Sequence, residues 1–112
     1  MATNNYASSL IDLQRFVDAK SLLCRMVPVA RRALGEGDRL TLKMRWIYAG
    51  ALYKDDDATL DDLRAAATTL EDTGRIARRV LGGAHPTTTG IEDHLRVARA
   101  ILRAREAPPT SC

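Results

Sequence analysis

Few side chains in this sequence are placed to do chemistry, and their spacing does not favour a metal site. His85 and His94 are nine residues apart with no cysteine near either, so they lack the clustered ligand set of a zinc site. Cys24 and Cys112 form neither a CxxC pair nor a secreted-type disulfide framework. The sequence therefore predicts reduced thiols and no metal or other cofactor.

The acidic run at residues 55–57, extended by Asp61 and Asp62, is a second candidate for chemistry. It lacks the alternating ligands and central glycine of a calcium loop, so a solvated turn is the simpler interpretation. No serine, cysteine or threonine has a recognisable base partner, and the sequence has no glycine-rich phosphate loop. We therefore expect a protein that is not an enzyme.

The charge pattern gives little support for nucleic-acid binding. The chain has 112 residues and a net charge of +3, carried mainly by arginines that alternate with acidic residues. A basic run with aromatic side chains that stack on bases is missing from the sequence. No apolar segment reaches the roughly 18 residues of a membrane span, and the N-terminus lacks a signal-peptide pattern. We expect a cytoplasmic protein without a membrane span.

A repeated segment indicates how the elements that position these residues are arranged. Residues 29–35 reappear in similar form as residues 76–82, at an offset of 47. Six residues after each closing glycine stands a threonine, Thr41 and Thr88. A fixed offset of about 20 to 50 residues is typical of stacked repeats, in which each unit buries its apolar face against its neighbours.

Apolar residues recur at helical spacing in five stretches, which predicts an all-α chain. The expected helices cover residues 4–13, 16–34, 39–53, 60–81 and 86–107. Pro28 lies inside the second stretch, where a proline removes a backbone donor, so a kink or break is expected there. Pro108 and Pro109 stop the last helix, which gives one domain over residues 1–107 and a disordered tail over residues 108–112.

Polar residues at the predicted helix ends have the types that cap helices. Gly35 and Gly82 are expected to end the second and fourth helices. The expected N-terminal caps are Asp38 for the third helix, Thr59 with Asp62 for the fourth, and Thr89 with Glu92, beside Pro86, for the fifth. His85 is interpreted as a further capping residue, and His94 as a surface or groove residue.

The junction at residues 78–88 resembles the tetratricopeptide repeat (TPR), in the longer variety found in kinesin light chains. There, Arg-Arg-x-Leu-Gly ends one helix and x-x-His-Pro-x-Thr follows, as in residues 78–82 and 83–88. Residues 4–10, Asn-Asn-Tyr-Ala-Ser-Ser-Leu, followed by Phe-Val-Asp-Ala at residues 16–19, match the hairpin of the same repeat. The resemblance implies antiparallel helical hairpins stacked as a short right-handed α-solenoid of about five helices.

In such repeats the first helix of each hairpin lines a concave surface, so the resemblance implies a partner-binding face. The residues that it assigns to this face are Asn4, Asn5, Ser8, Asp12, Lys43, Trp46, Ile47, Gly50 and Tyr53. An exposed tryptophan beside a glycine offers a large apolar contact with a gap for a partner's side chain. Two interpretations of Trp46 remain open: it contacts a partner, or it fills the space between hairpins.

The sequence also departs from the family pattern. The Trp46-Ile47 pair and the Asp93-His94 pair stand where the family has Asn-Asn, so a groove here has lost part of its polar lining. Because Met1 falls inside the first helix, the chain resembles the end of a longer array. The face near Tyr6 and Leu10 is then expected to be exposed, and to drive self-association or to dock a missing neighbour.

Two functions follow from these observations. The first is a protein-interaction module or scaffold, which holds an extended or helical segment of a protein partner in a shallow groove. The alternative is a structural helical subunit of a larger assembly without a peptide ligand. In that case Arg96, Arg99 and Arg103 would contact acidic surfaces or RNA. A truncated repeat fragment without a function of its own is a third interpretation.

Overall fold

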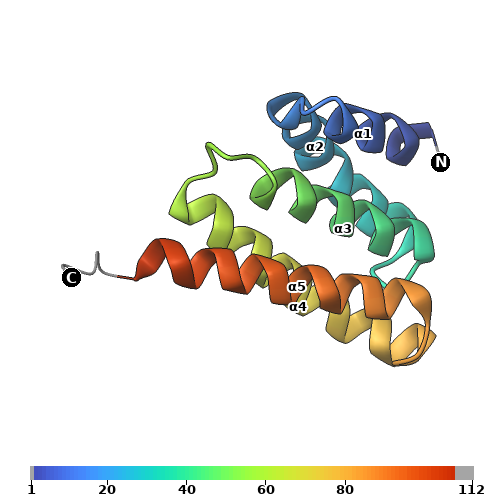
Figure 1. Cartoon of the computed structure of the whole chain (residues 1–112). Coiled ribbons are helices and arrows are strands. Elements are labelled where there is room, and N and C mark those ends of the chain that lie inside the picture. Colours follow the sequence, from blue (N-terminus) through green and yellow to red (C-terminus); the bar gives the residue numbers. More distant parts are fainter. Residues whose placement is uncertain (1, 108–112) are drawn as a thin grey trace.

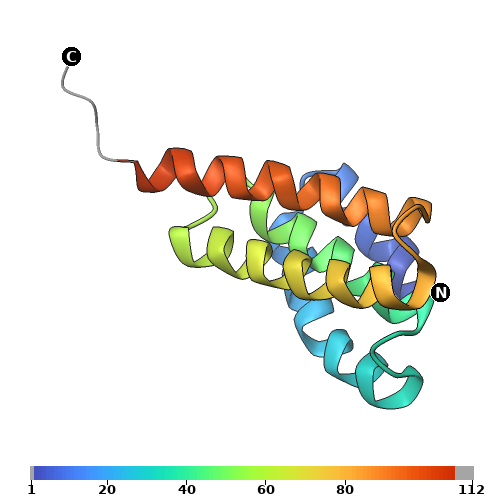
Figure 2. The ribbon, with the colours of Figure 1, turned by 90° about the horizontal axis from the view of Figure 1, so that it is seen from below.

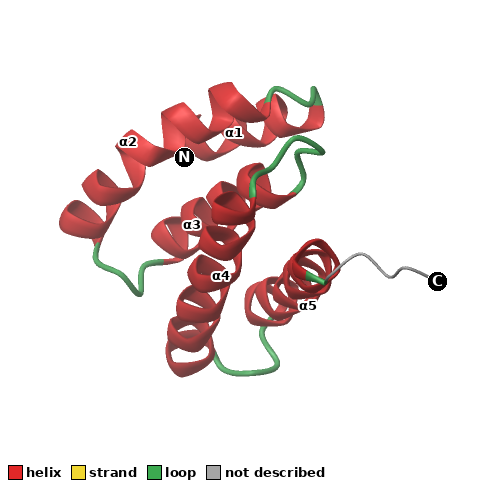
Figure 3. Ribbon diagram, turned by 90° about the vertical axis from the view of Figure 1, so that its left-hand side faces the viewer, coloured by secondary structure: helices red, strands yellow, loops and turns green. Residues whose placement is uncertain are grey.

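The computed structural model describes residues 2–107, which form five α-helices joined by short turns (Figure 1). The helices are α1 (Ala2–Asp12), α2 (Phe16–Leu34), α3 (Arg39–Tyr53), α4 (Leu60–Leu81) and α5 (Pro86–Glu106). The described residues contain no strand (Figure 3), so the predicted all-α fold is confirmed. The tail expected at residues 108–112 lies outside the described residues.

Consecutive helices run in opposite directions and pack against each other (Figure 1). In addition, α3 contacts both α1 and α5, whereas the backbones of α2 and α4 lie apart within residues 2–107. An ion pair between Lys20 of α2 and Asp62 of α4, with 3.7 Å between Nζ and Oδ2, links these two helices. The odd-numbered helices therefore lie side by side with α3 in the middle, and α2 and α4 lie behind them. Figure 2 shows α4 and α5 running next to each other along most of their length.

The two similar sequence segments form nearly identical helix ends. Gly35 has φ 93° and ψ 158°, and Gly82 has φ 94° and ψ 154°. Each glycine N–H donates over 3.1 Å to the carbonyl four residues earlier, on Arg31 and Arg78 respectively. Only glycine adopts such a positive φ without steric cost, so both glycines end their helices for the same physical reason.

Three of the predicted caps are present, and one is wrong. Asp38 Oδ1 accepts a hydrogen bond from the Leu40 N–H over 2.9 Å, and His85 Nδ1 accepts one from the Thr87 N–H over 3.1 Å. The capping box of Thr59 and Asp62 has both of its hydrogen bonds, each 3.1 Å long.

The capping box predicted at Thr89 does not form, because α5 already begins at Pro86 with His85 as its cap. Thr89 instead donates its hydroxyl to the Pro86 carbonyl over 3.1 Å, inside the first turn. Glu92, the other half of the predicted box, pairs with Arg78 of α4. The two candidate caps, His85 and Thr89, are four residues apart in the sequence. Pro86 favours the earlier one, because proline is well suited to the first position of a helix.

Most of the core lies between α3, α4 and α5, and smaller apolar clusters join α1 and α2 to α3. Leu10 belongs to one of these small clusters and is 3% exposed, so its predicted exposure is wrong, whereas Tyr6 is 59% exposed. A kink or break was expected at Pro28; the helix does not break there, since α2 continues through it to Leu34.

An ion pair between a buried arginine and a partly exposed aspartate joins α3 to α4. Arg45, 7% exposed, donates from Nη2 to Asp72 Oδ2 over 2.7 Å. This hydrogen bond, together with the charge of the guanidinium, lowers the pKa of Asp72. Removing Asp72 would leave the buried Arg45 guanidinium without its ion-pair partner, so the pair contributes to how α3 and α4 meet.

Candidate functional site

The front layer of helices forms a cavity of about 240 Å³ that is open to solvent. Its lining comes from three helices that lie side by side, with α3 contributing most of it. The lining residues are Ser8, Ile11 and Asp12 of α1, Lys43, Trp46, Ile47 and Gly50 of α3, Lys54 just after α3, and His94 of α5. Most of the exposed lining is apolar, so the cavity suits an apolar group.

The structure brings together most of the residues that the sequence assigned to the binding face. Ser8, Asp12, Lys43, Trp46, Ile47 and Gly50 all line the cavity. Ile11, Lys54 and His94 also line it and were not assigned to it from the sequence. For His94, the expectation of a surface or groove position agrees with its place in the lining.

Three assigned residues lie outside this lining. Asn4 is 5% exposed and donates from Nδ2 to the Leu40 carbonyl over 3.3 Å, so it ties α1 to the start of α3. Asn5 is exposed on α1 beyond the cavity. Tyr53 is 7% exposed. Asn4 and Tyr53 were expected at the surface, and both are buried because a neighbouring helix covers them.

Tyr53 does not line the cavity, but it contributes to the site through a hydrogen bond to His94, which does. The Tyr53 hydroxyl and His94 Nδ1 are 2.7 Å apart, and the two rings meet edge to face. Burial raises the pKa of Tyr53 to about 12. Burial also lowers the pKa of His94, and Lys54 lowers it further. Both groups are therefore neutral, and which of them donates depends on which ring nitrogen of His94 carries the proton.

Trp46 both fills space and lines the cavity, so the two interpretations of this residue are not exclusive. Its indole is partly buried and packs against the core of α3, α4 and α5. The ring also meets His94 edge to face, with 5.4 Å between the ring centroids. The rest of the indole borders the cavity, where a bound group would cover it.

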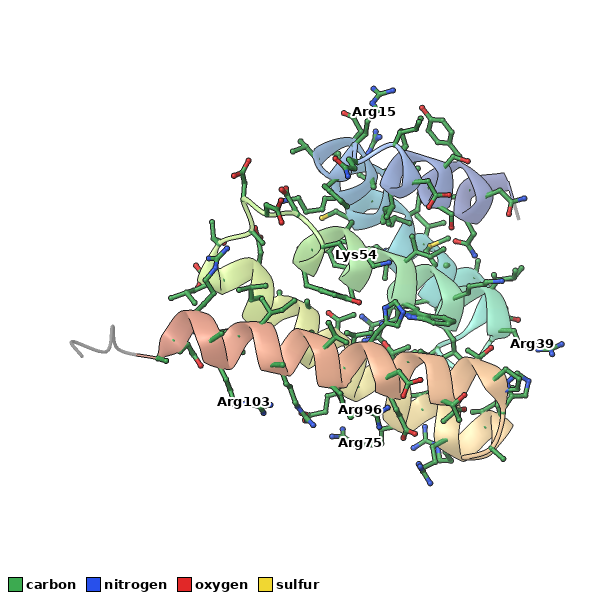
Figure 4. All side chains as sticks on the ribbon, viewed as in Figure 1. Arg15, Arg39, Lys54, Arg75, Arg96 and Arg103 are labelled. Atoms are coloured by element: carbon green, nitrogen blue, oxygen red, sulfur yellow. The ribbon has the colours of Figure 1, made fainter. Side chains whose placement is uncertain are left out.

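Charged groups stand at the edge of the cavity. Lys43, Lys54 and Asp12 are exposed, and each contributes to the lining. Lys54 lies between α1 and α5 (Figure 4). The arrangement can hold an apolar group against the indole while the ammonium groups attract acceptors around it.

The arginines of α5 occupy a different surface. Arg96 and Arg103 project from the side of α5 that faces away from α1 (Figure 4). Arg96 pairs with Asp93 on the same helix, and Arg99 pairs with Glu71 of α4 over 2.6 Å. These ion pairs offset part of the positive charge on this face.

No family model, curated protein or solved structure matches this chain. A membrane-crossing helix is absent from residues 2–107, since each of the five helices is too short or too polar for one. Within the same residues, no three His, Cys, Asp or Glu side chains are grouped so as to hold a metal ion.

Proposed function

We propose that this chain is a protein-interaction module that holds a segment of a partner protein, extended or helical, against the face made by α1, α3 and α5. In this proposal the five helices are a short right-handed solenoid of TPR-like hairpins, similar to those of kinesin light chains. The module acts as a cytoplasmic scaffold and not as an enzyme.

The packing of the helices supports the solenoid part of the proposal. In an array of helical hairpins, each hairpin contacts only its neighbours, and one helix of each hairpin lines a common face. Here α1, α3 and α5 are neighbours on one side, and the two helix ends at Gly35 and Gly82 have the same backbone conformation. Both features are expected when one structural unit occurs twice.

The observation that carries the binding proposal is the cavity beside Trp46. Tryptophan is enriched among the residues that dominate interface energies, because it buries a large area in a well-packed pocket. Here the indole is held in place by α5 and borders a cavity of about 240 Å³ with lysines at its edge. A partner can insert an apolar side chain there, and its backbone or acidic groups can reach the lysines.

The structural-subunit alternative has less support. It requires that Arg96, Arg99 and Arg103 contact acidic surfaces or RNA. Arg96 and Arg99 already pair with Asp93 and Glu71. Salt separates the two functions, since binding through an arginine face weakens steeply between low and moderate salt, and binding through an apolar cavity does not.

Peptide selection tests the proposal directly. A displayed library of random peptides would be selected on the full chain, and the affinities of the enriched peptides would be measured by calorimetry. Replacing Trp46 with Ala should weaken binding by about 2 kcal/mol or more. Gly50→Leu should abolish binding, because its side chain enters the cavity and a Cβ there meets only Lys54, at the ordinary distance of 3.7 Å.

Tyr6→Ala is the matched control, since Tyr6 is an exposed aromatic residue of α1 that does not line the cavity. Its affinity should equal that of the wild type. Asn5→Ala tests whether the bound segment extends beyond the cavity along α1. Circular dichroism confirms that each variant is folded. Peptides that bind the Gly50→Leu variant as well as the wild type would rule out this surface.

A further inference from the structure

A glycine on α5 lies against the six-membered ring of the Trp46 indole. A Cβ built on Gly90 would be 2.5 Å from Cη2 and 2.7 Å from Cζ2 of Trp46. Ordinary contact begins at about 3.4 Å, so the ring rests on the backbone of α5 at the one position without a side chain. Such a close approach explains why a glycine can occupy a helix interior despite its cost there.

The indole is thus held between α5 and the cavity. One turn after Gly90, the His94 ring meets the indole edge to face, and His94 is itself fixed by the Tyr53 hydroxyl. Because Gly90 lies against Cη2 and Cζ2 and His94 meets the ring edge to face, both from α5, this helix constrains the position of the indole. The same indole lines the cavity, so a displacement of the ring by a side chain at position 90 changes the space that the cavity leaves for a bound group.

The size of the cavity determines what fits. An apolar cavity of about 150 Å³ is sufficient for benzene. The present cavity, at about 240 Å³, therefore has room for a single ring and additional volume for a bicyclic group. Loss of even a small part of this volume should weaken binding of the bicyclic group more than binding of the single ring.

We propose that Gly90 is the specificity-determining residue of this cavity. Because it has no side chain, the Trp46 indole can lie close to α5, and the position of the indole sets the volume left for one aromatic side chain of the partner. This inference rests on the proposed function, for which it names the class of anchoring side chain. Gly90 contacts no partner itself and acts by positioning Trp46.

Two small probes test the proposal: phenol, a single ring, and indole, a bicyclic one. Their binding to the full chain would be followed by nuclear magnetic resonance, using the amide shifts of Ser8 and Gly50. The wild type should bind both probes at these residues. Gly90→Ala should weaken indole relative to phenol by about tenfold or more, the range expected when a pocket loses the volume of one carbon.

Rescue separates positioning from a general loss of structure. Trp46→Phe in the Gly90→Ala background should restore indole binding, because the smaller ring frees the volume that the methyl group displaced. Gly74→Ala is the matched control, since that glycine lies in α4, where a Cβ would meet Ile91 at 3.3 Å and Glu92 at 3.9 Å. It should leave the ratio of the two affinities unchanged.

Several results would overturn the proposal. These are failure of the wild type to bind either probe, shifts outside the cavity, or an unchanged affinity ratio in a folded Gly90→Ala variant. If that variant does not fold, Trp46→Phe alone serves as the test, since it enlarges the cavity and should favour 2-naphthol over phenol. No such change would also reject the proposal.

The outcome is distinguishable from failure of the proposed function. Peptides that bind at the cavity while the probe ratio stays constant would reject the role of Gly90 alone. A changed probe ratio without any peptide that binds there would reject the interaction module and keep the effect of Gly90 on the cavity.

Discussion

The junction between α2 and α3 and the junction between α4 and α5 share a backbone and differ in their side-chain partners. Both end a helix at a glycine with φ near 90° and start the next helix from an extended residue, Asp38 or His85. The nearby arginines, however, pair differently. Arg31 pairs with Glu36 in its own junction, whereas Arg78 reaches Glu92 across to α5.

The same contrast holds for the residues around each junction. The offset of 47 relates two copies of one sequence pattern, the first around the α2–α3 junction and the second around the α4–α5 junction. Corresponding positions are buried in both copies, as at Leu23 and Leu70, Thr41 and Thr88, and Ala51 and Ala98. At the cavity the paired positions differ, because His94 stands where the earlier copy has Ile47. The repeat thus preserves backbone and core packing, while the groups that could contact a partner diverge.

The largest expected effect comes from removing a matched core leucine from each copy. Leu70 packs in the large cluster of α3, α4 and α5, and Leu23 packs in a small cluster with fewer neighbours that can collapse more easily. Leu70→Ala should cost about 3–5 kcal/mol of unfolding free energy and Leu23→Ala about 2–3 kcal/mol. Urea unfolding followed by circular dichroism measures both, with the exposed Val17→Ala as control. Equal costs would show that the two copies are packed alike.

Matched substitution of the two helix-ending glycines should have an intermediate effect. A Cβ at Gly35 or Gly82 meets no atom within 4 Å, so the cost comes from the backbone alone. Gly35→Ala and Gly82→Ala should each lower stability by about 1–2 kcal/mol, and by the same amount. Gly50→Ala, inside α3, should instead be neutral or stabilising. Unequal costs at the two junctions would contradict their equivalence.

Local sequence signals predicted most of the fold. Glycine, aspartate and proline mark the helix ends, and the apolar period marks the helices, so four of the five predicted helix starts agree with the structure. These signals act within a few residues of each other. They are ambiguous where two caps compete, as at the fifth helix, where His85 caps the start at Pro86 and the capping box predicted at Thr89 does not form.

The cavity was only partly predictable, because it depends on how α5 crosses α3. The resemblance to a helical-repeat family assigned residues of α1 and α3 to one face. The burial of Tyr53 and the lining by Lys54 and His94 depend on contacts between residues far apart in the sequence. Gly90 carried only the weak signal of a glycine inside a helix, which indicates a packing reason without naming the neighbour.

Removing the hydroxyl from the buried threonine near each junction should have a smaller effect on stability and tests whether the two junctions differ in hydrogen bonding. Thr41 donates from Oγ1 to the Ala30 carbonyl over 3.4 Å, whereas Thr88 Oγ1 is buried without a hydrogen-bond partner among residues 2–107. Thr41→Val should cost about 1 kcal/mol, and Thr88→Val should be neutral or slightly stabilising. Thermal unfolding measures both. A similar cost at Thr88 would indicate that its hydroxyl is satisfied by water.

The smallest expected effect is a pH dependence that only the second copy has, since His94 replaces Ile47. Burial lowers the pKa of His94 in the folded chain, with Lys54 acting in the same direction and Asp93 opposing it. Below about pH 6.5 the unfolded chain therefore binds more protons at this residue. The contribution of His94 to stability should be constant above this pH and should fall as the pH decreases toward the folded-state value.

In His94→Gln, whose amide can still accept from Tyr53, the loss of stability between about pH 7.5 and pH 5.5 should be smaller than in the wild type. The same loss in both chains would assign the pH dependence to another group.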